Sequence, residues 1–190
     1  MTTTTILSEL IDEQCWEGVL ARLTTHPPEA SEPVTRGGTE SLPLHEACRL
    51  DPPADVIRAL VSAHRPAVRV RTRWQYLPLH VAARSSSARA VGALLEAYPR
   101  AARLKDQMGK LPVTLATEFG SSAEVVEKLL TIYPEGMFVR DSDGKGPMDY
   151  ARGKGSRRVM AAMERGRVYC AVSKAGEFFN FFFFPFYVII

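Results

Sequence analysis

The sequence predicts an all-α fold, a helical repeat solenoid of about four helix-pair units behind an N-terminal helical cap. One short segment recurs: Leu-Pro-Leu-His-Val-Ala-Ala at 77–83 is nearly copied at 42–48 and more loosely at 111–117 and 146–151. The prolines of these copies lie 34 or 35 residues apart. Between the copies, apolar residues recur at spacings of three and four, as on one face of a helix. Self-similarity at such a step is typical of arrays in which each unit packs on its neighbours.

Residues 1–41 are predicted to form the N-terminal helical cap, a degenerate first repeat, followed by a loop. Apolar residues from Ile6 to Leu23 have helical spacing and indicate one helix or two short helices in tandem, with Gly18 as a candidate break. His26 and the two prolines after it end this helical pattern. The segment 27–41 is rich in Pro, Glu, Gly, Ser and Thr, so we expect a loop there and, if anywhere, disorder.

The repeats are predicted over 42–152, and each contains the same parts. A proline opens a short first helix at its first position, where the missing N–H is no loss. A serine caps the second helix in two of the units. The corresponding residues are Pro43, Pro78 and Pro112 for the openings, Arg49, Arg84 and Glu118 for the first-helix ends, Ser87 and Ser122 for the caps, and His64, Tyr98 and Tyr133 for the second-helix ends.

Three connecting segments, here called the first, second and third finger, span 66–76, 99–110 and 134–145. Gln75 stands in the first finger where Gly109 and Gly144 stand in the other two. Because glycine normally supplies a positive φ at such a turn, we expect the turn of the first finger to differ in geometry.

The C-terminal part departs most from the pattern. A C-terminal capping helix is predicted over 153–170, and residues 171–190 are predicted to form an apolar Phe-rich tail outside the fold. The run from Phe178 to Ile190 is interrupted by Pro185 and is shorter than the ~20 residues that a spanning helix needs. Three interpretations of the tail remain open. It is an artefact of how the coding sequence was delimited, a disordered or loosely packed end over the last repeat, or an interfacial membrane anchor.

The motif Leu-Pro-Leu-His-x-Ala resembles the Thr-Pro-Leu-His-x-Ala signature of the ankyrin repeat family, and the period is similar. The segments 106–109 and 141–144 each end three residues before a proline, as the family's Asp-x-x-Gly turn does. The resemblance covers about 42–152 and implies stacked helix pairs that bind other proteins. In this chain Leu42, Leu77 and Leu111 replace the family's capping threonine. Each lost cap costs ~1 kcal/mol, which burial of the leucine offsets.

Candidate ligands for a metal are few. In a stack, His45 and His80 would occupy equivalent places in helices roughly 8–10 Å apart, too far to share an ion with bonds of about 2 Å. The resemblance implies that these imidazoles instead bridge backbone groups. Asp141 and Asp143 lack the further ligands of a calcium loop. The sequence shows no combination of residues that would form a nucleophile, a general base and an oxyanion site. We therefore expect no catalytic residue, no metal and no cofactor.

Composition sets the wider expectations. A net charge of +3 over 190 residues does not indicate nucleic-acid binding, so no nucleic acid is expected as a partner. Three widely spaced cysteines indicate a reducing compartment, and we expect a cytoplasmic or nuclear monomer. The N-terminus has no basic region and no long apolar run that would indicate a secretory signal.

The fingers differ in charge. The first and second each carry +3, whereas the third carries −1 and the loop 27–41 carries −2. Stacked fingers would form a basic patch with acidic ends, which is either a solvated rim or a docking surface for a protein partner with an acidic surface. The residues predicted to contact such a partner are Arg69, Arg71, Arg73, Trp74, Arg103 and Lys105.

The sequence therefore predicts a non-catalytic protein–protein interaction scaffold or adaptor that presents first helices and fingers. Two alternatives remain open. One is a membrane-associated adaptor held by the Phe-rich tail, the only segment expected to contact a membrane. The other is a targeting module of an enzyme complex.

Overall fold

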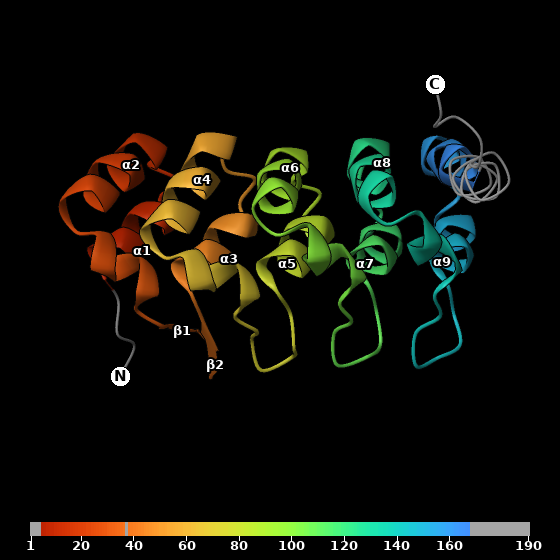
Figure 1. Cartoon of the computed structure of the whole chain (residues 1–190), viewed down its shortest axis with the longest axis horizontal. Coiled ribbons are helices and arrows are strands. Elements are labelled where there is room, and N and C mark those ends of the chain that lie inside the picture. Colours follow the sequence, from red (N-terminus) through yellow and green to blue (C-terminus); the bar gives the residue numbers. More distant parts are fainter. Residues whose placement is uncertain (1–4, 37, 168–190) are drawn as a thin grey trace, which may run out of the picture.

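The computed structural model describes residues 5–36 and 38–167. In this part of the chain the fold is all-α apart from one two-stranded hairpin, and Figure 1 shows the helices arranged in two rows along the long axis. One row contains α1 (Ile6–Asp12), α3 (Pro43–Cys48), α5 (Pro78–Arg84), α7 (Pro112–Phe119) and α9 (Pro147–Lys154). The other contains α2 (Trp16–Thr25), α4 (Ala54–Ala63), α6 (Ala88–Ala97) and α8 (Ala123–Ile132). Within each row every helix packs against the next.

Helices α3, α5 and α7 start as predicted, with a proline at the first helical position after an extended residue. The preceding leucines make no side-chain cap, and Leu42, Leu77 and Leu111 are buried. A different bond closes the helix start: the Nδ1 atoms of His45 and His80 accept the backbone N–H of Leu42 and Leu77 at 3.3 and 3.2 Å. The histidine thus satisfies the backbone N–H of the residue that precedes the helix.

The long helices of the second row also have the predicted ends. Ser87 and Ser122 cap α6 and α8, accepting the N–H of Ala90 at 3.3 Å and of Val125 at 3.4 Å. The residues that close α4, α6 and α8 have φ of −141°, −148° and −140°. Short 3₁₀ helices follow them: η2 (Arg65–Arg69), η3 (Pro99–Arg103) and η4 (Pro134–Phe138). Successive helix pairs therefore share nearly the same backbone geometry at this corner.

The core lies between the two rows and is continuous from α1 to the last described helix. Apolar residues three and four apart on each helix face the neighbouring helices, which is why the sequence spacing is helical. The largest fully buried side chains include Leu7, Ile11, Leu44, Ile57, Leu60, Leu79, Leu115, Leu129 and Met163.

The turns of the three fingers have the same geometry, so the expected difference in the first finger is wrong. Gln75 has a φ of 62°, close to the 73° of Gly109 and Gly144. Equivalent backbone N–H···O bonds of 2.9 Å close all three turns, from Thr72 to Tyr76, Asp106 to Lys110 and Asp141 to Lys145. These bonds hold Gln75 in the left-handed region, a conformation that costs a non-glycine residue about 1–2 kcal/mol.

The N-terminal break is not at Gly18. Helix α1 ends at Asp12 and α2 starts at Trp16, so Gly18 lies inside α2. A Cβ at this position would come within 3.0 Å of both Cys15 Sγ and a Leu10 methyl carbon. The glycine therefore permits close packing between the two helices rather than a chain break.

The segment 27–41 was expected to be a loop and the likeliest region of disorder, but its described residues have regular structure. It contains a 3₁₀ helix, η1 (Pro27–Ser31), and an antiparallel hairpin of β1 (Val34–Arg36) and β2 (Thr39–Ser41). Glu29 anchors η1 because it pairs with Arg22 and accepts the backbone N–H of Leu7 at 3.1 Å. The bond between Glu29 and Leu7 joins residues 22 apart in sequence, so local composition did not reveal it.

At the C-terminal end, α9 stops at Lys154 before Gly155, and a further helix runs over 157–167. Buried Val159, Ala162 and Met163 from that helix join the core. Residues 168–170 of the predicted capping helix, and the whole Phe-rich tail at 171–190, lie outside the described residues. Among the helices described, none combines the length and apolar character needed to cross a membrane.

Candidate functional site

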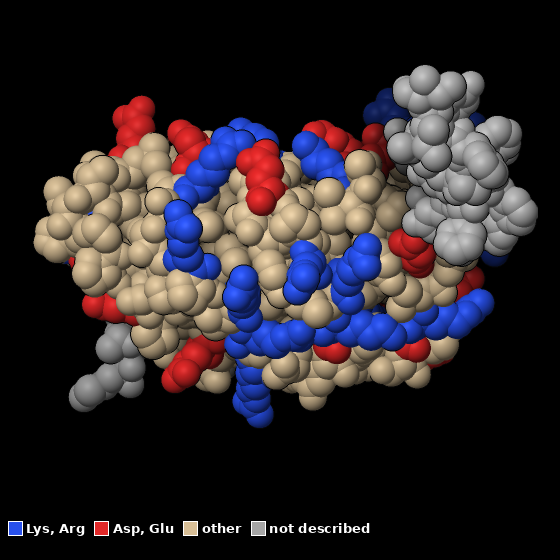
Figure 2. Space-filling view, in the orientation of Figure 1, with Lys and Arg blue, Asp and Glu red and all other residues tan. Residues whose placement is uncertain are grey.

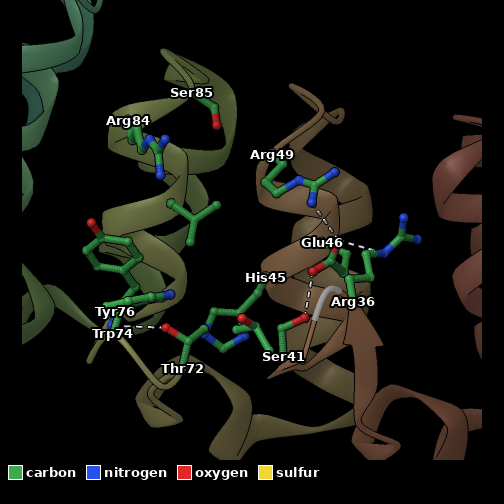
Figure 3. Close-up of a pocket in the computed structure, with 12 residues that line it drawn as sticks. Arg36, Ser41, His45, Glu46, Arg49, Thr72, Trp74, Tyr76, Arg84 and Ser85 are labelled. Carbon is green, nitrogen blue, oxygen red and sulfur yellow. Dashed lines mark hydrogen bonds and ion pairs between the residues drawn. The ribbon is translucent and has the colours of Figure 1, made fainter. Parts of the chain in front are cut away.

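A groove with a volume of about 520 Å³ opens between α3 and α5, beside the β1–β2 hairpin (Figure 3). One wall carries Glu46 and Arg49 at α3 and Arg36 from the hairpin, and the other carries Arg84 and Ser85 at the end of α5 (Figure 3). The lower part is formed by the first finger. This α3–α5 groove is lined by Arg36, Thr39, Ser41, His45, Glu46, Arg49, Thr72, Trp74, Tyr76, Val81, Arg84 and Ser85.

The groove has a net charge of +2, from three arginines and one glutamate. The buried Glu46 is neutralised from two sides, with ion-pair distances of 3.2 Å to Arg36 Nε and to Arg49 Nη1. Ser41 donates its hydroxyl to the other carboxylate oxygen at 2.6 Å. Buried charge of this kind is stable only when paired. The pairing also fixes the two arginines on one wall.

The opposite wall presents Arg84, which has no carboxylate partner within the described residues. Its guanidinium lies 4.4 Å from the centre of the Phe119 ring, a cation–π arrangement that orients the side chain without neutralising it. Arg36 also pairs with Asp12, and Arg49 pairs with Glu46, so within the described residues the uncompensated positive charge of the groove is that of Arg84.

Two aromatic side chains of the first finger border the groove. Trp74 is 52% exposed, and the Arg73 guanidinium lies 5.8 Å from its ring. Tyr76 is half-buried, its ring stacks on that of His80 with centroids 6.0 Å apart, and burial raises the pKa of its hydroxyl. Exposed aromatic residues beside arginines are enriched in the parts of protein interfaces that contribute most to binding.

The histidines near the groove are structural. Burial lowers the pKa of His45 to about 4, against the opposing effect of the nearby carbonyls of Tyr76 and Val70. Burial also lowers the pKa of His80 to about 4, and the Arg71 charge acts in the same direction. Both imidazoles are therefore neutral at physiological pH, with Nδ1 engaged at the helix start. Across residues 5–36 and 38–167, no group of three or more His, Cys, Asp or Glu side chains could hold a metal ion.

The six predicted contact residues lie in different surroundings. Trp74 lines the α3–α5 groove, with Arg73 beside its ring, whereas Arg69 lines a different groove between α4 and α6. Arg71 and Lys105 run between fingers: Arg71 donates to the Lys105 carbonyl at 2.9 Å, and Lys105 donates to the Arg140 carbonyl at 3.2 Å. Figure 2 shows a row of Lys and Arg side chains along the long axis of this face.

Arg69 and Arg103 hold equivalent positions and make equivalent contacts. The Arg69 guanidinium lies 5.1 Å from the centre of the Tyr98 ring, and that of Arg103 lies 4.8 Å from the Tyr133 ring. Each tyrosine belongs to the next helix pair along the chain. Four of the six predicted residues, Arg69, Arg71, Arg103 and Lys105, therefore link consecutive pairs in addition to giving the surface its charge.

Sequence reasoning missed Arg36, Arg49, Arg84 and Tyr76 as groove residues. A signal for two of them was present, because Arg49 and Arg84 each lie six residues after the proline that opens their helix. The same position in the next unit is Glu118, which instead binds Lys110 at 2.6 Å. Arg36 gave no such signal, since only the folded hairpin brings it to α3.

Comparison of the sequence with protein-family models found no match, and comparison with curated proteins found none either.

Proposed function

We propose that this chain is a non-catalytic recognition scaffold built from ankyrin-like helical repeats, and that its α3–α5 groove receives an acidic segment of a protein partner. The repeat assignment is supported by the recurring motif and by the two rows of helices with matching corners. A stack of this kind gives each unit two neighbours to pack on and leaves its first helices and fingers free to vary.

The observation that carries the binding proposal is the composition of the groove. It combines a net charge of +2, an exposed tryptophan and hydroxyl donors within a volume of about 520 Å³. Carboxylates of a partner would face Arg84 on one wall and Arg49 on the other. An apolar partner side chain would cover Trp74 and displace water from its ring.

The framework is suited to holding this geometry before a partner arrives. The first finger is tied to the second by the Arg71 bond and by the backbone, because the Gln107 N–H donates to the Trp74 carbonyl at 3.3 Å. On the other wall, Arg49 is held by the buried Glu46. Groups fixed in this way lose little conformational entropy on binding, which favours affinity.

The test is a selection of random peptides of about twelve residues, displayed on phage, against the full chain. We expect acidic sequences with an aromatic or aliphatic residue. The double variant Arg49→Glu and Arg84→Glu should weaken their binding at least tenfold, about 1.4 kcal/mol, because it reverses charge on both walls. Trp74→Ala should weaken binding by a similar factor.

The control is Arg100→Glu, which reverses one charge, half of the change in the double variant, at an exposed residue outside the groove. Its affinity should stay within about twofold of the wild type, since rim charges away from the contact contribute little. Equal losses in the control and the double variant would show a general charge effect and would reject the groove as the site.

A further inference from the structure

A second groove lies between α4 and α6, with a volume of about 820 Å³. It shares no lining residue with the α3–α5 groove and is formed by the other row of helices together with η2. This α4–α6 groove is lined by Arg58, Val61, Ser62, Arg65, Pro66, Val68, Arg69, Val70, Ala93, Glu96 and Ala97.

Small side chains on α6 leave this groove open. Ala93 and Ala97 form its wall on that helix. At the equivalent positions of α8, 35 residues further on, stand Lys128 and Ile132. There the Lys128 ammonium extends over α6 and would lie 3.6 Å from a Cβ at Gly92. The longer side chain thus covers the corresponding space between α6 and α8, whereas two methyl groups cannot cover it between α4 and α6.

The floor of the groove is apolar. Val61 and Val68 contribute aliphatic surface, and Val70 is 37% exposed although it is a large apolar residue. A strip of this kind at a groove bottom matches one or two aliphatic side chains of a binding segment.

The rim of the groove is basic. Arg58, Arg65 and Arg69 oppose a single carboxylate, Glu96, which gives a net charge of +2. Glu96 pairs with Arg58 across the groove at 3.0 Å, with both side chains largely exposed. Within the described residues Arg65 and Arg69 have no carboxylate partner, and Arg69 is oriented by the Tyr98 ring.

We propose that the α4–α6 groove is a second docking site, for an acidic protein segment that lays an aliphatic side chain between the valine floor and the alanine wall. Its carboxylates bind Arg65 and Arg69, the two rim cations left without a counter-charge. The aliphatic floor distinguishes such a segment from a purely phosphate-rich ligand, which would leave Val61 and Val70 uncovered. Because the two grooves are separate, the chain can hold one acidic segment on each row of helices.

The probe is a phage-displayed library of random peptides of about twelve residues, selected on the full chain and counter-selected on Arg65→Glu. Recovered peptides are measured by fluorescence anisotropy against each variant, with circular dichroism as a check of folding. We expect acidic sequences around a leucine, isoleucine or valine. Arg65→Glu should weaken binding at least tenfold, about 1.4 kcal/mol.

Ala97→Gln tests the apolar lining of the groove independently of charge. It keeps helix propensity at an exposed helical position and covers the groove with a neutral side chain. We expect at least a fivefold loss of affinity. Arg100→Glu, outside the groove, is the matched charge control and should change affinity less than twofold.

Four outcomes would overturn the proposal. One is the recovery of no peptide that distinguishes wild type from Arg65→Glu. The second is full binding by Ala97→Gln. The third is displacement of the peptides by a single-stranded oligonucleotide at lower concentration than by an acidic peptide. The fourth is loss of binding in Arg49→Glu with Arg84→Glu, which would assign the peptides to the α3–α5 groove. Peptides for the two grooves should bind one molecule simultaneously, so each groove can fail without the other.

Discussion

The Arg71 guanidinium donates to the backbone carbonyl of Lys105, the residue that holds the equivalent place in the next finger, at 2.9 Å. Lys105 repeats this contact one finger further on, donating to the Arg140 carbonyl at 3.2 Å. The fingers are therefore joined by a series of cationic side chains and carbonyl oxygens. A basic surface row that resembles a docking patch in the sequence also has a structural role.

Removal of Arg71 should destabilise the fold. Arg71→Ala deletes hydrogen bonds to the carbonyls of Gln75 and Lys105 and should lower the free energy of unfolding by roughly 1 kcal/mol, since the contact is partly exposed to water. Urea denaturation measures the change. Arg73→Ala, a neighbouring exposed arginine that makes neither bond, should have an effect within about 0.5 kcal/mol. Equal effects would contradict the structural role of Arg71.

Gln75→Gly should stabilise the first finger. Gln75 has a φ of 62°, which glycine adopts without strain. Relief of the left-handed conformation, about 1–2 kcal/mol, exceeds the entropy that glycine adds to the unfolded chain, so we expect a gain of up to ~1 kcal/mol in thermal or urea unfolding. Gln107→Gly, whose φ is not positive, is the control and should destabilise slightly. A loss in both variants would disprove the strain at Gln75.

Ser87→Ala should be more damaging than Ser122→Ala. Both serines cap a helix, and a lost cap costs ~1 kcal/mol. Ser87 is fully buried and also donates to Asp51 Oδ1 at 2.7 Å, so its replacement breaks a link to the preceding helix pair as well. We expect the difference between the two variants to be about 1 kcal/mol in urea denaturation. A larger loss for Ser122→Ala would contradict this ranking.

Stability should fall as the pH drops from about 6.5 towards 4. The pKa values of His45 and His80 are lowered from 6.5 to about 4 in the folded chain, chiefly by burial. In this range the unfolded chain binds protons that the folded chain does not, so acid favours unfolding, and above the unfolded pKa the effect disappears. Each histidine contributes a slope of up to about 1.4 kcal/mol per pH unit.

His80→Thr checks this assignment, since threonine occupies the equivalent position at Thr114. Between pH 5 and 7, urea denaturation of the variant should show a shallower pH dependence than the wild type, by the contribution of one histidine. If the free energy of unfolding changes with pH by the same amount in both proteins, His80 does not contribute to the loss of stability in acid.

Local chemistry predicted much of the fold. Proline at the first helical position and serine at the caps act through neighbouring atoms, so Pro78, Ser87 and Ser122 could be assigned from sequence. The turn at Gln75 and the packing at Gly18 could not, because hydrogen bonds and close contacts elsewhere override the local preference. These two errors have the same origin, in that a residue's own propensity was given more weight than its surroundings.

The grooves were harder to predict than the helices. Each depends on side chains about 35 residues apart that meet only after the helices pack, such as Arg49 with Arg84, or Arg58 with Ala93. The residues predicted from the finger charges are distributed over the two grooves and the contacts between fingers. Because the motif recurs every 34 or 35 residues, residues at equivalent positions can be compared. This comparison shows that Ala93 lacks the long side chain that Lys128 extends towards the neighbouring helix.

The alanines at 93 and 97 have a consequence for how such an array changes over time. Neighbouring layers differ at these positions by side chains alone, so exchanging the pair with Lys128 and Ile132 would close one recess and open another, roughly 8–10 Å along the axis. Four substitutions, with no insertion and no change of backbone, would relocate a binding position. If both proposed grooves bind a segment, substitutions of this kind would change the distance between the two bound segments in steps of one helix pair.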